Sequence, residues 1–476
     1  MTKLLRIPSL FASALLLAAV VGACADGDPL GPDGGGIEPG DATISADITA
    51  NRTLYADTTY TLSGFVKVAN NATLTIQAGT KIIGDFDVPG SSLFVLRGSK
   101  IIAIGTAEDP IVFTSERTTA RQAGDWGGLI IVGNGVVNRA DPTILEGTGT
   151  GASNPQVNYA GGTINTDNSG ELRYVRVEFA GYATAQDQEL NSFTFAAVGS
   201  GTRLSYLEAL YGLDDAFEWF GGAVDAKYLV SYETGDDHFD ASEGFSGRNQ
   251  FLIAFQSIRP DARPAAGSAS TDPQGIENDG CNGSNCLSGQ NSLPRTNAIF
   301  ANFTLVGTGP GVIDATSGGI GMMLRRGTAG SYVNGIVARW PRAAISLRDQ
   351  TTLDRASDGS LVLRNLYLAE NGPTFQAASG TTVQGAVDLT ANAIEVAAAG
   401  TTAASIFTSL PAAPSAAANL DWALAAGVAP RTGGTGAFTG ALATQAGTFV
   451  TGTSYRGAAD PAGVKWWAGW TNYARN

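Results

Sequence analysis

Residues 204–257 read LSYLEALYGLDDAFEWFGGAVDAKYLVSYETGDDHFDASEGFSGRNQFLIAFQS. Short apolar runs in this stretch begin at Leu204, Tyr228 and Phe251, so successive runs start 24 and then 23 positions apart. Each run is rich in aromatic and branched residues, and Gly and Asp turn residues follow it. A period this short leaves no room for a βαβ crossover, and it fits a propeller blade of about 40 residues less well. The stretch therefore predicts an all-β solenoid, a parallel β-helix in which one repeat forms one coil.

The same pattern extends toward the N-terminus. In residues 72–84, ATLTIQAGTKIIG, the apolar Leu74 and Ile76 alternate with the polar Thr75 and Gln77, as in a half-buried strand. Similar runs follow at residues 91–115 and 124–135. We therefore expect coils over residues 46–370.

Several motifs also resemble one known group of proteins. They are LTIQAGTKI, GTAEDPIVFTS, GDWGGLIIVGNG, LRYVRVEFAG, DDAFEWFGG, MMLRRGTAG, VNGIVARW and, near the end, WWAGWTNY. They resemble the bacterial right-handed parallel β-helix surface proteins of the pectate-lyase-like superfold, which are exported, often lipid-anchored and of largely unassigned function. The resemblance covers about residues 55–345 and the last twenty or so. It implies the right-handed fold and export, and it implies no particular chemistry.

Residues 1–23 have the pattern of a secretory signal. Lys3 and Arg6 precede an apolar run from Leu10 to Val21, which is too short to span a bilayer stably. Residues 21–24, Val-Gly-Ala-Cys, resemble the bacterial lipobox, which implies cleavage before Cys24 and a lipid on its sulfur. Ala25 replaces the Asp that marks inner-membrane retention in such lipoproteins, so the resemblance favours the outer membrane or cell surface.

Composition shifts divide the rest of the chain. Residues 24–45 are rich in Gly, Asp and Pro and predict a flexible tether. Residues 371–450 are rich in Ala, Thr and Gly and fit outer coils, end-covering helices or a loose appendage. Residues 451–476 hold three tryptophans, and we expect them to cap the exposed strand edge of the last coil; they are Trp466, Trp467 and Trp470.

Charge and two scarce residue types exclude several functions. The chain has a net charge of −14, and loss of Lys3 and Arg6 with the signal takes it to −16, which disfavours nucleic acid and anionic lipid. His238 is the only histidine and there are three cysteines, so a zinc site of several His ligands is excluded. With Cys24 lipidated, Cys281 and Cys286 remain, and in an exported protein we expect them to form a disulfide.

Two acidic motifs repeat with the coil period. DDAFEWFGG starts at Asp214 and DDHFDASEG at Asp236, an offset close to one coil. The offset predicts that Asp214 stacks on Asp236, Asp215 on Asp237 and Glu218 on Asp240, each about 5 Å apart. Glu189 extends this column one coil earlier, and Glu243 lies just beyond it. Glu277, in the polar stretch of residues 257–294 that we expect to form a long loop, adds oxygens if that loop folds back.

Stacked carboxylates repel each other by about 3 kcal/mol per pair at an effective dielectric constant near 20. Shared protons, neighbouring N–H groups or arginines, or a hard cation relieve this repulsion, and outside a cell the cation is Ca²⁺. We expect a structural Ca²⁺ site at Asp214, Asp215, Asp236 and Asp237. The alternative is that these residues are only solvated turn acids.

A ligand site is expected on the same flank. Glu218, Asp240 and Glu243 supply its polar groups, and Trp219 offers a ring face because Gly221 and Gly222 follow it. The predicted function is a lipid-anchored envelope protein that binds a glycan or another surface component there. A scaffold or adhesin without a small ligand remains an alternative.

The other alternative is a polysaccharide lyase or hydrolase. Its catalytic candidates are Asp214, Asp215, Asp236, Asp237, His238 and Asp240, because hydrolases need paired carboxylates. A lyase would also need a base, for which Arg248 is the nearest candidate. One polygalacturonase-like fragment, Asn165-Thr166-Asp167, is present, but the Gly-His-Gly and Arg-x-Lys partners of that family are missing. We therefore interpret the fragment as a coincidence.

Overall fold

The computed structural model describes residues 40–475, except residues 315, 317 and 379–383. The expected signal peptide, Cys24 and most of the tether lie outside the described residues. What is described belongs to one compact unit, Glu38–Asn476. None of its described helices is long and apolar enough to cross a lipid bilayer.

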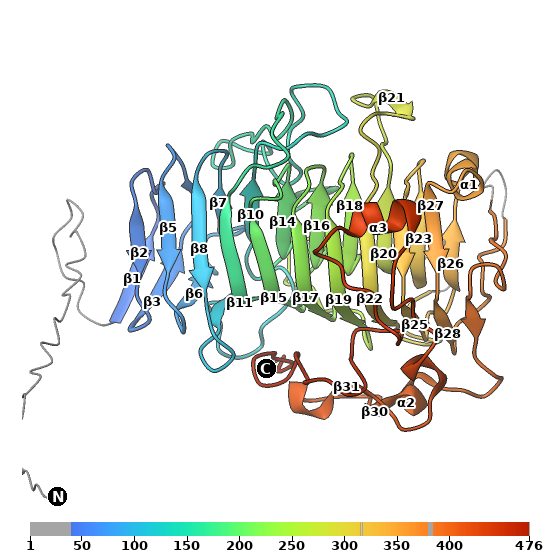
Figure 1. Ribbon diagram of the computed structural model, residues 1–476. Helices are drawn as coiled ribbons and strands as arrows, with labels where there is room; N and C mark the ends of the chain where they lie inside the picture. Colours follow the sequence, from blue (N-terminus) through green and yellow to red (C-terminus); the bar gives the residue numbers. More distant parts are fainter. Residues whose placement is uncertain (1–39, 315, 317, 379–383, 476) are drawn as a thin grey trace, which may run out of the picture. The chain divides into compact units, whose positions relative to one another are not determined.

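The coils are built from two parallel sheets, and Figure 1 shows their strands side by side along the unit. The smaller sheet has nine strands, which form one side of successive coils. In spatial order they are β4 (Phe65–Val68), β7 (Ser92–Val95), β10 (Leu129–Val132), β14 (Phe193–Ala196), β16 (Phe217–Phe220), β18 (Phe239–Ser242), β20 (Gln274–Asp279), β23 (Ile320–Arg325) and β26 (Ala343–Leu347).

The larger sheet has 17 strands in two adjoining ladders. Five long strands run through both ladders: β11 (Gly170–Glu178), β15 (Arg203–Leu210), β17 (Asp225–Tyr232), β19 (Arg248–Phe255) and β22 (Ile299–Val306). The first ladder also holds β2 (Arg52–Leu54), β5 (Thr73–Ile76), β8 (Lys100–Ile104), β24 (Gly330–Val333) and β27 (Leu361–Arg364). The second holds β1 (Gly40–Ile44), β3 (Thr58–Leu62), β6 (Lys81–Gly84), β9 (Ile111–Ser115), β25 (Ile336–Ala338), β28 (Tyr367–Ala369) and β29 (Glu395–Val396). The architecture is the expected all-β solenoid, a parallel β-helix.

Each long strand turns a corner at one residue with a left-handed backbone. At Tyr174, Tyr206, Tyr228 and Phe251 the φ angle lies between 49° and 65°. This conformation is uncommon for bulky residues, and here the rings stack with centroids 4.4, 4.5 and 5.2 Å apart. The corners at Tyr206 and Tyr228 mark the length of one coil. This coil is slightly shorter than the spacing between the apolar runs predicts, because those runs start at Leu204 and Tyr228.

The coil interior takes every second residue of the smaller sheet. Phe193, Phe217 and Phe239 stack in one inward column, with centroids 5.0 and 5.6 Å apart. Trp219 occupies the neighbouring inward position and is fully buried. The residues between them, such as Glu218, point to the outer face of the sheet because side chains alternate along a strand.

The shorter elements lie outside the coils. They are the hairpin β12 (Ala183–Ala185) and β13 (Gln188–Glu189), β21 (Leu287–Gln290), the pair β30 (Phe407–Ser409) and β31 (Asp421–Leu424), α1 (Gln350–Ser357), α2 (Ala403–Ile406), α3 (Gly440–Ala446) and the 3-10 turns η1 (Ala417–Asn419) and η2 (Ala429–Arg431). The disulfide between Cys281 and Cys286 is confirmed, with Cα atoms 5.9 Å apart.

The C-terminal segment packs along the side of the coils. We call residues 464–475 the C-terminal strap. Trp466 contacts Tyr228, and Trp470 lies edge-on to Tyr174 and Tyr206. These rings belong to β11, β15 and β17 in the middle of the solenoid. The expectation that the tryptophans cap the strand edge of the last coil is therefore wrong, because Trp466 and Trp470 pack on the corner rings of these middle coils.

Candidate functional site

Three carboxylates form a column on the outer face of the nine-stranded sheet. Glu218 of β16 is in register with Asp240 of β18, and Asp240 is in register with Glu277 of β20. The predicted stacking of Glu218 on Asp240 is confirmed by this pairing. Glu277 does not lie on a loop as expected, because residues 274–279 form a strand and bring it into the column.

The turns that lead into β16 and β18 carry the two Asp pairs, Asp214–Asp215 and Asp236–Asp237. Oδ1 of Asp215 accepts a hydrogen bond from the backbone N–H of Asp237 at 2.8 Å, and Oδ1 of Asp237 accepts one from the N–H of Gln274. The flanking coils repeat this contact with amide side chains. The side-chain oxygen of Asn191 accepts a hydrogen bond from the backbone N–H of Asp215, and that of Gln274 accepts one from the N–H of Ile320. Stacked side chains thus tie successive coils together, and the second oxygen of each Asp is left outside this ladder.

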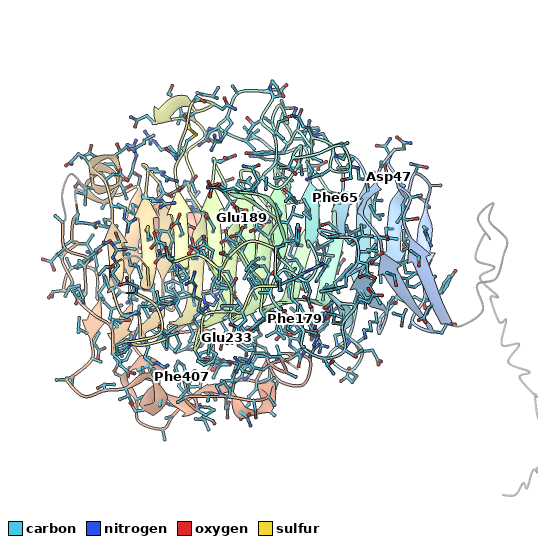
Figure 2. All side chains as sticks on the ribbon, turned by 180° about the vertical axis from the view of Figure 1, so that it is seen from behind. Asp47, Phe65, Phe179, Glu189, Glu233 and Phe407 are labelled. Carbon is cyan, nitrogen blue, oxygen red and sulfur yellow. A yellow bond between two sulfur atoms is a disulfide. The ribbon has the colours of Figure 1, made fainter. Side chains whose placement is uncertain are left out.

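The acids share one cavity of about 160 Å³ with no apolar lining. We call it the acidic pocket, and its lining residues are Glu146, Glu189, Asp214, Asp215, Glu218, Asp236, Asp237, Asp240 and Glu277. Glu189, which is labelled in Figure 2, belongs to the β12–β13 hairpin and not to the strand column, where Thr194 is the residue in register with Glu218. Glu146 was missed by sequence analysis, because it lies in a non-repetitive segment with no coil register to align it.

Burial and mutual repulsion favour the protonated form of these acids. Burial, followed by the charge of Glu189, raises the pKa of Glu146 to about 8. Burial raises the pKa of Asp236 to about 7. The pKa of Asp214 is also raised well above its usual value by burial and then by the charge of Asp236. Carboxyl groups whose pKa lies this close to neutral pH readily give up their protons when a cation binds.

Few positive groups neutralise the acidic pocket. Of the nine acids that line the acidic pocket, only Glu277 forms an ion pair among the described residues, and its partner is Arg325. Arg325 also contacts Asp279 at 2.7 Å, and Arg326 pairs with Asp279 as well. Eight of the nine carboxylates therefore face one another without a direct cationic partner.

The carboxylate oxygens are close enough to share an ion. Three groups have ligand atoms within 4.8 Å of one another: Asp214 with Asp215 and Asp236, Asp215 with Glu218 and Asp240, and Asp237 with Asp240 and Glu277. Oδ1 of Asp240 is buried and has no hydrogen-bond partner among the described residues. Asp237 is only 3% exposed and uses one oxygen in the ladder. A donor set made only of carboxylate oxygens fits a hard divalent cation.

Trp219 and His238 do not face the acidic pocket. Trp219 is fully buried among Phe195, Phe217 and Phe245, so the expectation of an accessible ring for a ligand is wrong. His238 is also fully buried, and its Nδ1 lies 2.6 Å from the Ser231 hydroxyl. Burial lowers the pKa of His238 to about 3. A neutral histidine inside the coil cannot reach a substrate, which removes it from the catalytic candidates.

The remaining candidates have structural partners. Glu243 is 3% exposed, pairs with Arg139 and accepts a hydrogen bond from Tyr159, beside the acidic pocket but not in its lining. Arg248 pairs with Asp225 on the larger sheet. Asp167 accepts a hydrogen bond from the N–H of Asn134, a local role that agrees with reading the Asn165–Asp167 fragment as a coincidence.

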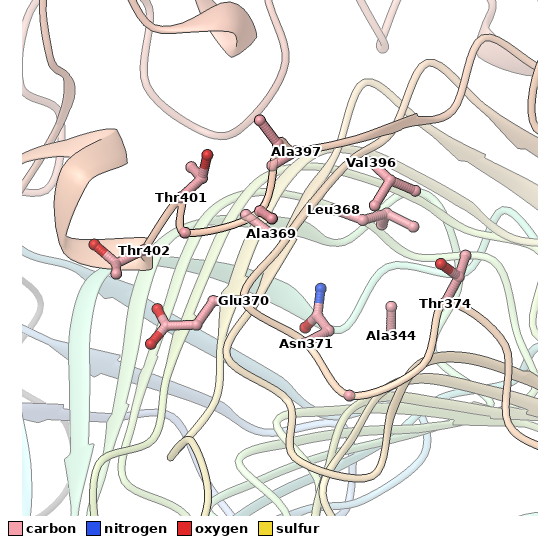
Figure 3. Close-up of a pocket in the computed structure, with 14 residues that line it drawn as sticks. Ala344, Leu368, Ala369, Glu370, Asn371, Thr374, Val396, Ala397, Thr401 and Thr402 are labelled. Atoms are coloured by element: carbon pink, nitrogen blue, oxygen red, sulfur yellow. The ribbon is translucent and has the colours of Figure 1, made fainter.

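A second cavity of about 330 Å³ lies near β26, β28 and β29 (Figure 3). Its lining is mostly Ala, Gly and Thr. Glu370 is the single acid in this lining, and its Oε2 already accepts a hydrogen bond from the N–H of Ala403 at 2.6 Å. The cavity offers little chemistry, so the acidic pocket is the stronger candidate site.

Comparison with known proteins supports the fold. A family model described as a pectate-lyase-like β-helix domain matches residues 46–422. No curated protein and no solved structure matches the chain. The acidic pocket lies within the matched residues.

Proposed function

This chain belongs to the family of pectate-lyase-like β-helix domains, and from that premise we propose that it is a cell-envelope protein that binds Ca²⁺ in the acidic pocket and, through it, an extracellular glycan or other surface component. Family membership suggests a carbohydrate-related or surface role. The observation that carries the proposal is the convergence of nine carboxylates on one cavity of about 160 Å³.

Calcium fits this donor set better than other common cations. It takes six to eight oxygen ligands in flexible geometry, whereas Mg²⁺ demands a tight octahedron and keeps several waters. Zinc prefers nitrogen and sulfur ligands, which the lining of the acidic pocket does not offer. Asp214, Asp215, Asp236 and Asp237 would hold the ion with Glu218, Asp240 and Glu277. The bound charge would neutralise the repulsion among these groups, and its open coordination positions would take hydroxyl or carboxylate oxygens of the ligand.

The structure suggests a variant that removes ligands without breaking the ladder. In Asp215→Asn with Asp237→Asn, each amide oxygen still accepts the backbone hydrogen bond, as Asn191 does in the preceding coil. At free Ca²⁺ of about 100 times Kd, the wild type should gain about 2.7 kcal/mol of stability. We expect calorimetry to show heat of Ca²⁺ binding and chelator to lower the melting temperature, and the double variant to lose both effects.

Asp187→Asn is a matched control. Asp187 is exposed beside the acidic pocket but does not line it, and Asn tolerates its positive φ of 54°. This variant should bind Ca²⁺ almost as the wild type does. Metal-free wild type that melts at the same temperature with and without Ca²⁺ would refute the proposed cation site.

The same acids also allow a hydrolase, because Asp236 with a pKa of about 7 lies beside Asp214 and Asp215. A carboxylic acid that is protonated near neutral pH is suited to general acid catalysis. The double variant separates the two functions. A hydrolase would lose glycan cleavage with unchanged or higher stability, since removing two charges relieves repulsion.

The proposal includes a lipid anchor on Cys24 and export to the outer membrane or cell surface. It rests on the signal-like residues 1–23 and the lipobox-like residues 21–24. We expect Cys24→Ser to abolish fatty-acid labelling and to move the protein from the membrane fraction to the soluble fraction. Unchanged partition of this variant would contradict the anchor.

A further inference from the structure

The wall of the acidic pocket that carries Glu146 is not part of a coil. Between β10, which ends at Val132, and β11, which begins at Gly170, the chain makes an excursion without a strand. We call residues 134–168 the insertion. Figure 1 shows it as the teal loops beside β10 and β14.

The insertion packs on the outer face of the nine-stranded sheet through an apolar cluster. Its own buried members are Val137, Leu145, Val157, Tyr159 and Ala160. They contact outward residues of the sheet and one residue of the hairpin end, namely Phe94, Ile130, Val132, Ala196, Phe220 and Leu190. This cluster lies directly beside the acids, since Leu145 precedes Glu146 in the chain.

Polar contacts fix the two arms of the insertion. The N–H of Asn138 donates to the backbone oxygen of Glu243 at 2.9 Å, and Arg139 pairs with the Glu243 carboxylate. On the returning arm, the Tyr159 hydroxyl donates to the same carboxylate. Near Glu146, the Thr184 hydroxyl donates to the backbone oxygen of Gly147 at 3.1 Å.

Glu146 opposes this docking. It lines the acidic pocket, and the described residues offer its carboxylate neither a hydrogen-bond donor nor an ion-pair partner. The neighbouring charges that act on it most strongly belong to acids, first Glu189 and then Asp236 and Glu243. Closing the insertion therefore brings one more carboxyl group into a cavity that already holds eight, where it either repels the others as a negative charge or must take up a proton. A cation in the acidic pocket reverses the sign of that interaction.

We infer that the insertion is a lid whose closure over the acidic pocket is coupled to cation binding through Glu146. The inference rests on the proposed Ca²⁺ site and adds its regulation. Buried acids alone would not indicate a ligand, but Oδ1 of Asp240 is buried without a partner among the described residues, and Asp237, which is 3% exposed, lines the same cavity. Because coupling is reciprocal, a cation that favours the closed lid is in turn bound more tightly by it.

Hydrogen exchange of the full exported domain, titrated with Ca²⁺ alone, tests this coupling. Exchange in residues 140–160 should slow by about 5- to 150-fold, the usual range of coupling between two events. The midpoint should coincide with that of the binding heat measured by calorimetry. Amides of β5 and β8, which do not border the acidic pocket, should not change.

Variants separate Glu146 from the general charge of the site. Glu146→Gln should still bind Ca²⁺ through the coil carboxylates, more weakly, while its exchange in residues 140–160 no longer responds to the ion. Asp187→Asn, which removes a neighbouring charge outside the acidic pocket, should keep the response. Calcium binding without any change in exchange would overturn the lid and leave the proposed function standing. Absence of binding heat in the wild type would overturn both.

Discussion

The alternation of side chains along β16 decides what each residue of DDAFEWFGG can do. Glu218 points outward and Trp219 inward, so the acid reaches the acidic pocket and the ring fills the coil. The two glycines after Trp219 do not expose its face. A Cβ on Gly222 would lie 2.4 Å from the backbone oxygen of Val198, so this glycine allows neighbouring turns to approach closely. From the sequence alone, a glycine that exposes a neighbouring ring cannot be distinguished from one that allows two turns to approach closely.

The buried His238 gives a pH-dependent prediction at the residue scale. Its pKa is about 3 in the folded protein and about 6.5 when unfolded, so below pH 6.5 the unfolded chain binds a proton that the folded chain does not. Stability should therefore be lost as the pH falls from 6.5 toward 3, by about 2 kcal/mol at pH 5. Urea unfolding at pH 7 and pH 5 should show this loss in the wild type and not in His238→Asn, whose amide can still contact Ser231. The acids with raised pKa act in the opposite direction, so the comparison rests on the difference between the two proteins.

Equal losses in His238→Asn and wild type between pH 7 and pH 5 would contradict a neutral histidine in the coil. Ser231→Ala serves as a control, because it removes the hydroxyl that lies 2.6 Å from Nδ1 and leaves the imidazole in place. Its overall stability should fall. Its loss between pH 7 and pH 5 should persist.

At the scale of elements, repetition made the coils predictable. The one-coil offset of the two Asp motifs correctly places Glu218 on Asp240, because both motifs begin the same side of a coil. The strand β20 escaped prediction, since the polar residues before it read as one long loop and its Glu-Asn-Asp sequence lacks apolar alternation. Glu146 escaped for a related reason: an insertion meets the coils through tertiary contacts that no period records.

The ladder of Asn191, Asp215, Asp237 and Gln274 shows how strands and site are linked. The same turn position takes an amide in the outer coils and a carboxylate in the inner two. Because amides satisfy the backbone equally well, the backbone hydrogen bonds do not require the carboxylates. The negative charge at Asp215 and Asp237 therefore has a reason beyond the fold, and cation binding in the acidic pocket supplies one.

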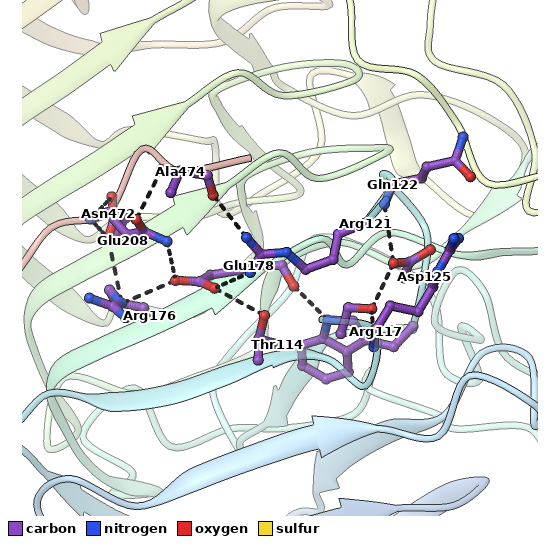
Figure 4. Close-up of polar contacts among 12 residues, drawn as sticks. Thr114, Arg117, Arg121, Gln122, Asp125, Arg176, Glu178, Glu208, Asn472 and Ala474 are labelled. Carbon is purple, nitrogen blue, oxygen red and sulfur yellow. Dashed lines mark hydrogen bonds and ion pairs between the residues drawn. The ribbon is translucent and has the colours of Figure 1, made fainter. Parts of the chain in front are cut away.

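At the scale of the whole unit, the C-terminal strap packs against coils that are distant from it in sequence (Figure 4). The N–H of Asn472 donates to both oxygens of the buried Glu208, and its side-chain amide donates to Glu178. Arg176 donates to the backbone oxygen of Trp470 at 3.0 Å. The strap thus adds hydrogen-bond donors to the buried Glu208 of β15 and Glu178 of β11, which already have Arg176 beside them, and its rings cover the stacked corner rings.

Trp470→Ala tests how far the influence of the strap extends. Trp470 is 1% exposed, and truncating a buried tryptophan costs about 3–5 kcal/mol. In a solenoid, stability is close to a sum of neighbouring interfaces, so this loss should be local. Hydrogen exchange should become faster in β11, β15 and β17, whose corner rings contact the strap, and stay unchanged in β2 and β5 near the N-terminal end. Val464→Ala, at a strap position that is 84% exposed, should change neither region. Faster exchange in all coils of Trp470→Ala would mean that the solenoid opens as a single unit, and that the strap stabilises the whole unit and not only its middle coils.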